Sequence, residues 1–240
     1  MANASTLPDG SRGRISHGPS DNLTQRTLEF VCAQLPRWRD DPNRKSEFSE
    51  EALNAQLCKF LNVAARNEFP MVYFHHEERQ TGRRRVDLSA LPTRNLLIGS
   101  TYRSIYDPFF VLEGKRLPAP TGTREREYVT GGADKSGGIQ RFKLGLHGAN
   151  VTDAGMIGYV QSGTFASWLV MINNWISELT TDPTVPDERW SDADKLADFS
   201  EREDVHTATL SSEHRRANGT TSPNIRIRHL WVEISPTTRS

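Results

Sequence analysis

Apolar residues recur at helical spacing in the first quarter of the chain. One apolar stripe predicts a helix over about residues 22–39, and a second predicts a helix that begins at the cap-like Ser49 and ends near Arg66. The stripes consist of Leu23, Leu28, Val31 and Leu35 in the first helix, and of Leu53, Leu57, Phe60, Leu61 and Ala64 in the second.

The pattern then changes to short apolar runs, which are typical of strands. Strands are expected over residues 71–78, 83–90 and 107–115, with 95–99 as a short extra strand or an edge piece. A second group of elements is expected further on: a helix over 139–148, a strand over 155–161, a helix with its stripe over 165–179, and a closing strand over 224–234. Residues 182–204 are acidic and contain proline, so they predict a solvated loop or a short helix.

The order of these elements, α-α-β-β-β-α-β-α-β, indicates an α/β fold. The length of 240 residues fits one domain, which we place at residues 21–240. Its core is expected over about 46–161, with a C-terminal helix and strands over 164–234. Residues 1–20 are small, polar and punctuated by glycine and proline, and are expected to be a disordered leader.

The composition limits the choice of partners. Thirty basic residues balance thirty acidic ones, so no overall positive field attracts nucleic acid. Cys32 and Cys58 have no Cys or His at metal-ligand spacing, which favours a reducing cytoplasm over a disulfide framework or a zinc site. The most apolar window, residues 156–176, contains the polar residues Gln161, Ser162, Asn173 and Asn174, so no membrane span is expected.

The strand over 107–115 ends with charged residues that follow an apolar run directly. Side chains alternate between the faces of a strand, so Glu113 and Lys115 point to the same side, roughly 6.5–7 Å apart. If this strand pairs with the strand over 83–90, Asp87 lies beside Glu113. Two adjacent carboxylates repel each other, whereas Mg²⁺ binds one or two carboxylates together with water and phosphate oxygens. The pattern therefore predicts a Mg²⁺ site at Asp87 and Glu113, with the carbonyl of Gly114 as a further ligand.

Asp87 followed by Glu113-Gly114-Lys115 at a strand end resembles the PD-(D/E)xK nuclease superfamily, and the surrounding element order is similar to its α-β-β-β-α-β core. Val86 stands where the superfamily usually has proline. The resemblance implies a restriction-endonuclease-like fold and a Mg²⁺-dependent endonuclease, with Mn²⁺ as a substitute ion. Lys115 would orient or deprotonate the attacking water, or neutralise charge on the phosphorus.

The resemblance also implies auxiliary site residues. The helix before the sheet offers a further acid, Glu50 or, in reserve, Glu51; the alternative is that both only stabilise the helix N-terminus. Basic and amide side chains for contact with nucleic acid are expected at Arg83, Arg85, Gln140, Arg141 and Lys143, and solvated surface charge is the alternative for each basic residue.

The remaining motifs favour structural roles. The glycine-rich stretch over 131–138 lacks the Lys-Ser/Thr of a phosphate-binding loop. His75, His76, Glu77 and Glu78 alternate faces and cannot converge on one ion, so they are expected to be half-buried strand positions. His214 is expected at the surface.

The function expected is cleavage of DNA in bacterial defence, since the sequence resembles small nucleases of such systems. The neutral net charge suggests a homo-oligomer or a protein partner that brings the nucleic acid. The alternatives are an RNase, a non-catalytic scaffold or nucleic-acid-binding subunit of the same fold, and an unrelated small-molecule hydrolase.

Overall fold

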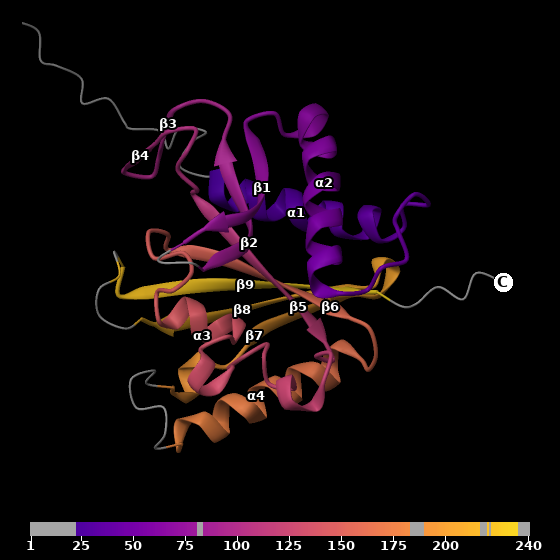
Figure 1. The fold of residues 1–240 in the computed structure, drawn as a ribbon, viewed down its shortest axis with the longest axis vertical. Helices are drawn as coiled ribbons and strands as arrows, with labels where there is room; N and C mark the ends of the chain where they lie inside the picture. The colour runs from indigo at the N-terminus through magenta and orange to yellow at the C-terminus, as the bar shows by residue number, and fades with distance from the viewer. Residues whose placement is uncertain (1–22, 81–83, 183–189, 217–219, 221, 235–240) are drawn as a thin grey trace, which may run out of the picture.

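The computed structural model describes residues 23–80, 84–182, 190–216, 220 and 222–234 (Figure 1). The expected leader at 1–20 lies outside these residues. The described chain forms a seven-stranded mixed sheet with helices on both faces, which confirms the α/β class. Among the described helices, none combines the length and the apolar character that crossing a bilayer requires.

The sheet has the strand order β1-β2-β5-β6-β9-β8-β7. Strands β5, β6 and β9 run parallel to one another, and the remaining neighbours pair antiparallel. The strands are β1 (Val72–Arg79), β2 (Arg85–Pro92), β5 (Phe110–Leu117), β6 (Asp153–Val160), β7 (Ala197–Arg202), β8 (Thr207–Arg215) and β9 (Asn224–Glu233). The chain segment that connects β2 to β5 forms a separate hairpin of β3 (Leu96–Ile98) and β4 (Thr101–Arg103). β3 confirms the short extra strand expected over 95–99.

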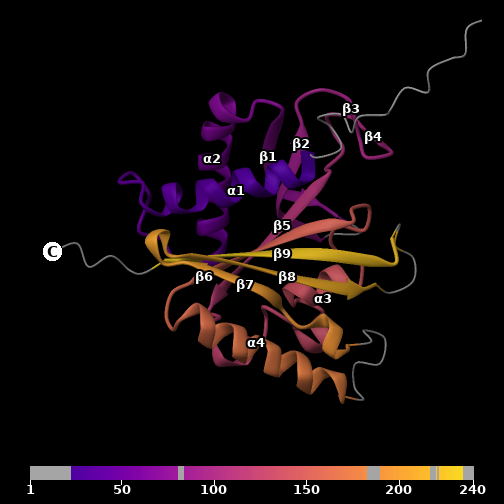
Figure 2. The same ribbon diagram turned by 180° about the vertical axis from the view of Figure 1, so that it is seen from behind.

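Helices α1 (Leu23–Arg39) and α2 (Glu50–Glu68) cover one face of the sheet, and α3 (Gly138–Lys143) and α4 (Phe165–Thr180) lie on the other (Figures 1 and 2). The predicted apolar stripes are the buried sides of these helices. Ser49 caps α2 as predicted, because its side chain accepts a hydrogen bond from the Ala52 N–H. Each face of the sheet has its own core cluster, and the strand residues alternate between the two clusters.

Two parts of the C-terminal prediction were wrong. The segment 182–204, expected as a loop or short helix, contains edge strand β7, and β8 was not predicted. A hydrophobicity pattern does not predict β7, because all six of its residues are exposed. His214, expected at the surface, is fully buried, because its strand β8 lies between β9 and β7 and faces the core under α4.

Buried polar side chains form a continuous hydrogen-bond chain on this face of the sheet. Trp231 Nε1 can only donate, and it lies 2.8 Å from the Tyr128 hydroxyl oxygen. Tyr128 donates its own proton to His229 Nδ1, at 2.8 Å. His229 then carries its proton on Nε2, which donates to Ser212 Oγ at 2.7 Å. The direction of these bonds is set at the other end of the chain, where the ionised carboxylate of Asp194 can only accept.

The chain continues from Ser212 to α3. Ser212 donates to His214 Nε2 at 2.7 Å, and His214 Nδ1 donates to Asp194 Oδ1 at 2.7 Å. The same oxygen accepts from Lys143 Nζ at 2.7 Å. Both imidazoles are neutral in this arrangement, because each has one nitrogen that donates and one that accepts. The buried hydrogen-bond chain thus consists of Trp231, Tyr128, His229, Ser212, His214, Asp194 and Lys143.

The two histidines make stability depend on pH. Burial holds the pKa of His214 below its usual value and that of His229 well below it. The unfolded chain takes up these protons near pH 6.5 and the folded chain does not, so stability falls as pH drops below that value. The expected slope is about 1.4 kcal/mol per pH unit for each histidine.

This slope is measurable by urea unfolding at pH values from 7.5 to 5. His229→Gln removes one of the two titrating groups, so the fall should become shallower. His75→Gln, at an exposed histidine on β1 outside the buried hydrogen-bond chain, is the control. A slope that is the same in the wild type and in His229→Gln would contradict the assignment.

Candidate functional site

The candidate site lies where β2 and β5 separate. The two strands pair at only three described positions, Ala90↔Phe110, Ser89↔Val111 and Leu88↔Leu112. Asp87 precedes Leu88 and Glu113 follows Leu112, so both acids lie where the ladder ends. The expected pairing of these two strands is confirmed.

One hydrogen bond joins the two strands beyond their ladder. The backbone N–H of Gly114 donates to Asp87 Oδ2 at 2.8 Å. Because β2 has already separated from β5 at this point, a side chain of β2 takes the place of a backbone carbonyl. The bond brings Asp87 to the backbone of the Glu-Gly-Lys segment.

Gly114 is glycine because α2 approaches the strand closely. A Cβ at this position would lie 2.1 Å from Asn54 Oδ1, which is far inside contact distance. Asn54 cannot turn away without loss, since its Oδ1 accepts a hydrogen bond of 2.7 Å from the buried Tyr159 hydroxyl. The absence of a side chain at Gly114 therefore allows the close approach of α2 to β5.

Glu113 is a fully buried carboxylate with cations on one oxygen. Its Oε1 accepts a hydrogen bond of 2.6 Å from Arg141 Nη1 and lies 3.4 Å from Lys115 Nζ. His147 Nδ1 lies 3.0 Å from the other oxygen, Oε2, but outside hydrogen-bond geometry. Burial raises the pKa of Glu113, and Lys115, His147 and Arg141 outweigh it and hold the net pKa below its usual value.

Lys115 connects this carboxylate to α2. Its ammonium group is 4% exposed and lies 2.6 Å from Glu50 Oε1. Burial lowers the pKa of Lys115, but the charges of Glu113, Glu50 and Asp87 outweigh it and raise the net value. Lys115 therefore carries a positive charge in this arrangement.

Asp87 is half-buried and forms the open side of the site. Burial raises its pKa well above the usual value, and the charge of Glu113 raises it further. The two neighbouring carboxylates thus oppose each other's ionisation, and a divalent cation between them would remove this repulsion.

The resemblance implies Mg²⁺, which needs oxygen ligands that are free to bind it. Within the described ranges, no three His, Cys, Asp or Glu side chains are arranged to hold a metal ion. Two carboxylates are nevertheless enough for Mg²⁺. Glu113 Oε2 is buried and accepts no hydrogen bond from the described residues, so it is available as a ligand. Asp87, Glu113 and the Gly114 carbonyl therefore fit the ion, whereas the structure directs Glu50 to Lys115.

The residues expected to contact nucleic acid are dispersed. Arg141 lies at the site, where it donates a hydrogen bond to Glu113. Lys143 is buried and bonded to Asp194, so its expected contact with phosphate is not supported. Arg85 is exposed and paired with Glu77. Arg83 lies outside the described residues.

Gln140 holds the glycine-rich loop. Its Oε1 accepts hydrogen bonds from the backbone N–H groups of Gly131 and Gly137, at 2.9 and 3.3 Å. Its Nε2 donates to the Gly132 carbonyl at 3.0 Å. Gln140 is fully buried, so the structure gives it a role in shaping the loop instead of contact with nucleic acid.

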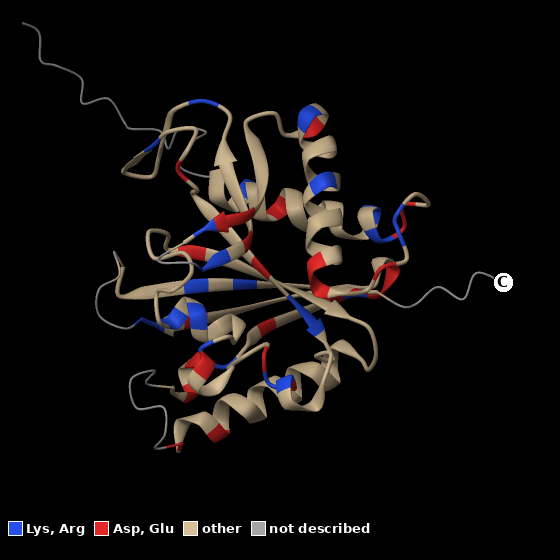
Figure 3. Cartoon of the chain, viewed as in Figure 1, with Lys and Arg blue, Asp and Glu red and all other residues tan. Residues whose placement is uncertain are grey.

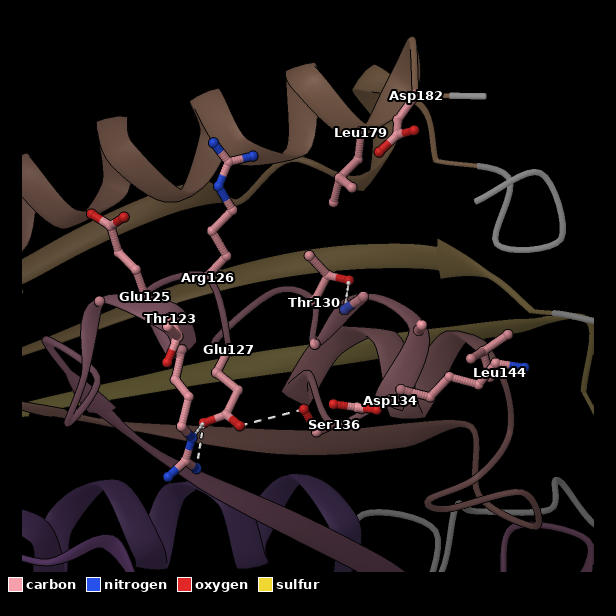
Figure 4. A pocket seen from close by; sticks show the side chains of 16 residues that line it. Thr123, Glu125, Arg126, Glu127, Thr130, Asp134, Ser136, Leu144, Leu179 and Asp182 are labelled. Atoms are coloured by element: carbon pink, nitrogen blue, oxygen red, sulfur yellow. Dashed lines mark hydrogen bonds and ion pairs between the residues drawn. The ribbon is translucent and has the colours of Figure 1, made fainter. Parts of the chain in front are cut away.

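The glycine-rich loop borders a cavity of about 790 Å³ (Figure 4). Its walls mix apolar side chains with charged side chains of both signs, and Glu127 there accepts hydrogen bonds from Arg124 and Ser136. Neither Asp87 nor Glu113 lines this cavity. Basic and acidic residues are interspersed along the helices and strands (Figure 3). The cavity and the candidate site are therefore separate features.

Two residues beside Glu113 and Gly114, namely Asn54 and His147, were not predicted from the sequence. Asn54 carries only the signal of a polar residue on the apolar stripe of α2. His147 has no spacing signal, because it lies in the loop after α3 and approaches Glu113 through tertiary packing.

No match was found when the chain was compared with models of protein families, with curated proteins and with solved structures.

The contact between Gly114 and Asn54 predicts the effect of a single methyl group. Gly114→Ala should destabilise the protein by about 1–3 kcal/mol, because the new Cβ displaces Asn54 and leaves the Tyr159 hydroxyl unpaired. Urea unfolding measures the change. In an Asn54→Ala background the same substitution should cost less, since the clashing side chain is gone. Equal costs in both backgrounds would contradict this account.

Proposed function

We propose that the protein is a metal-dependent nuclease of the PD-(D/E)xK superfamily with a restriction-endonuclease-like core. The observation that supports this best is the hydrogen bond from Gly114 N–H to Asp87 Oδ2 at the β2–β5 fork. It joins the aspartate to the Glu-Gly-Lys segment at the point where the ladder between the two strands ends.

Asp87, Glu113 and the Gly114 carbonyl would hold the ion, Mg²⁺ with Mn²⁺ as a substitute. A bound Mg²⁺ supplies Lewis-acid chemistry: it neutralises charge on a phosphodiester and lowers the pKa of water. Lys115 provides a fixed positive charge that stabilises the negative charge developing at the phosphorus. Glu50 orients the lysine, and Arg141 is partly exposed and lies within reach of both Glu113 and a phosphate group.

The substrate proposed is DNA, with RNA as the alternative. Among the described residues the site opens at Asp87, Glu50 and Arg141, the three partly exposed members of the group. The basic and acidic residues of the chain are equal in number and are interspersed along the cartoon of Figure 3, so a protein partner or a second copy of the chain would help to bring the nucleic acid. Defence against foreign DNA is the role proposed for such an assembly.

A non-catalytic scaffold of the same fold is the second candidate. It is favoured by the ion pairs that already compensate Glu113, since Arg141 and Lys115 both approach Oε1. In a scaffold these pairs would serve stability alone.

A cleavage assay separates the two candidates. Purified protein is incubated with linear DNA, supercoiled DNA and RNA, in Mg²⁺, Mn²⁺ or EDTA. Asp87→Asn should reduce cutting at least about 100-fold, because it removes a ligand charge but keeps an oxygen for the Gly114 N–H. Asp192→Asn, at an exposed aspartate, is the matched control. Cutting that persists in EDTA or in Asp87→Asn would contradict the proposal, and no cutting of any substrate by the wild type would favour the scaffold.

Adjacent acids on α2 provide a second test. Glu50→Gln should slow cutting about 10- to 100-fold, because Lys115 loses the carboxylate that orients it. Glu51→Gln, at the exposed neighbour on the same helical turn, should leave the rate unchanged. Single-turnover rates with DNA at saturating Mg²⁺ measure both. Equal rates in the two variants would mean that Glu50 serves only the helix N-terminus.

A further inference from the structure

His147 is a buried histidine that the described structure leaves without hydrogen bonds. Its side chain is 0% exposed, and neither ring nitrogen makes a hydrogen bond with a described residue. Buried polar atoms are almost always paired, so an unpaired imidazole beside a charged group indicates a functional constraint. Its Nδ1 lies 3.0 Å from Glu113 Oε2, which is itself unpaired.

The position of the imidazole is set by its backbone and by one aromatic neighbour. The N–H groups of Leu146 and His147 both donate to the Arg141 carbonyl, at 2.9 and 3.3 Å. The imidazole packs edge-on against Phe142, with an interplanar angle of 81°. His147 is therefore held in place independently of Glu113.

Arg141 and His147 approach the same carboxylate from one short segment. Arg141 Nη1 binds Oε1 at 2.6 Å, while His147 Nδ1 lies at Oε2. The hydrogen bonds to the Arg141 carbonyl join the two residues into one rigid unit. Because each carboxylate oxygen has two lone pairs, a side-chain donor on each still leaves lone pairs for an ion.

We propose that His147 is a positioning residue: its Nδ1, 3.0 Å from Oε2 of Glu113, is placed to donate to this oxygen and hold it toward the metal site when an ion binds, while Arg141 fixes Oε1. The inference rests on the proposed function, since it concerns the same metal site. Carboxylates that bind metal ions are themselves held by hydrogen bonds, and loss of such a partner commonly weakens metal binding 10- to 100-fold.

Three substitutions separate positioning from packing. His147→Phe keeps an aromatic ring against Phe142 and removes both nitrogens. His147→Asn keeps a donor at the place of Nδ1, and His147→Gln places one nearer to Nε2. Mn²⁺ is the probe, and binding to the full-length protein is measured from the electron paramagnetic resonance signal of the free ion.

His147→Phe should weaken Mn²⁺ binding about 10- to 100-fold, and His147→Asn should restore it to within about threefold of the wild type. His147→Gln should restore it less. Urea unfolding of metal-free protein should show that His147→Phe is as stable as the wild type or more so, because the substitution removes unpaired buried nitrogens. Weaker metal binding without a loss of stability is the signature of positioning.

The outcomes distinguish the inference from the proposed function. If His147→Phe binds Mn²⁺ as tightly as the wild type while Asp87→Asn does not, the role of His147 is overturned and the metal site stands. If His147→Asn binds as weakly as His147→Phe, the assignment to Nδ1 is overturned. If the wild type binds no more Mn²⁺ than Asp87→Asn does, the proposed metal site fails, and the inference fails with it.

Discussion

The carboxylate of Glu113 is a negative charge with no access to solvent, and much of the structure around it compensates that charge. Removal of an ion from water is costly unless charged or hydrogen-bonding groups replace the lost hydration. Lys115 from the same strand and Arg141 from α3 supply positive charge at Oε1. Lys115 then binds Glu50, so the compensation of one buried charge extends from α3 through β5 to α2. Helices on opposite faces of the sheet are connected through this group.

Helix α3 has three polar side chains with three different tasks. Gln140 holds the glycine-rich loop, Arg141 binds Glu113, and Lys143 ends the buried hydrogen-bond chain at Asp194. The helix has only six residues, and these bonds fix its position against the sheet. The candidate site and the buried hydrogen-bond chain therefore share one short helix.

The β2–β5 fork explains how a strand in the middle of a sheet presents polar groups. In an uninterrupted ladder the Gly114 N–H would donate to a backbone carbonyl of β2 and would not be available to the side chain of Asp87. Because the ladder ends at Leu88↔Leu112, the side chain of Asp87 accepts that bond. The close approach of Asn54 then restricts position 114 to glycine. Backbone and helix packing thus bring the charged residues together.

The sequence by itself determined the elements with a clear apolar period. Helices α1, α2 and α4 and strands β1, β2, β5, β6 and β9 follow from such stripes and runs, since burial of one face imposes the period. The shared face of Glu113 and Lys115 was also predictable, because alternation along a strand needs no knowledge of distant partners. Their expected place at a strand end was wrong, since β5 continues to Leu117. Strand β7 was not, since an exposed edge strand carries no apolar signal.

Only the tertiary structure decided how the polar residues pair. Lys143 and Arg141 look equivalent as helix charges, yet one is buried against Asp194 and the other binds Glu113. His214 and His147 lie in polar stretches, and their burial depends on strands and loops far away in the chain. Hydrogen bonds and ion pairs are short-ranged and directional, so their partners are set by the fold and leave no period in the sequence.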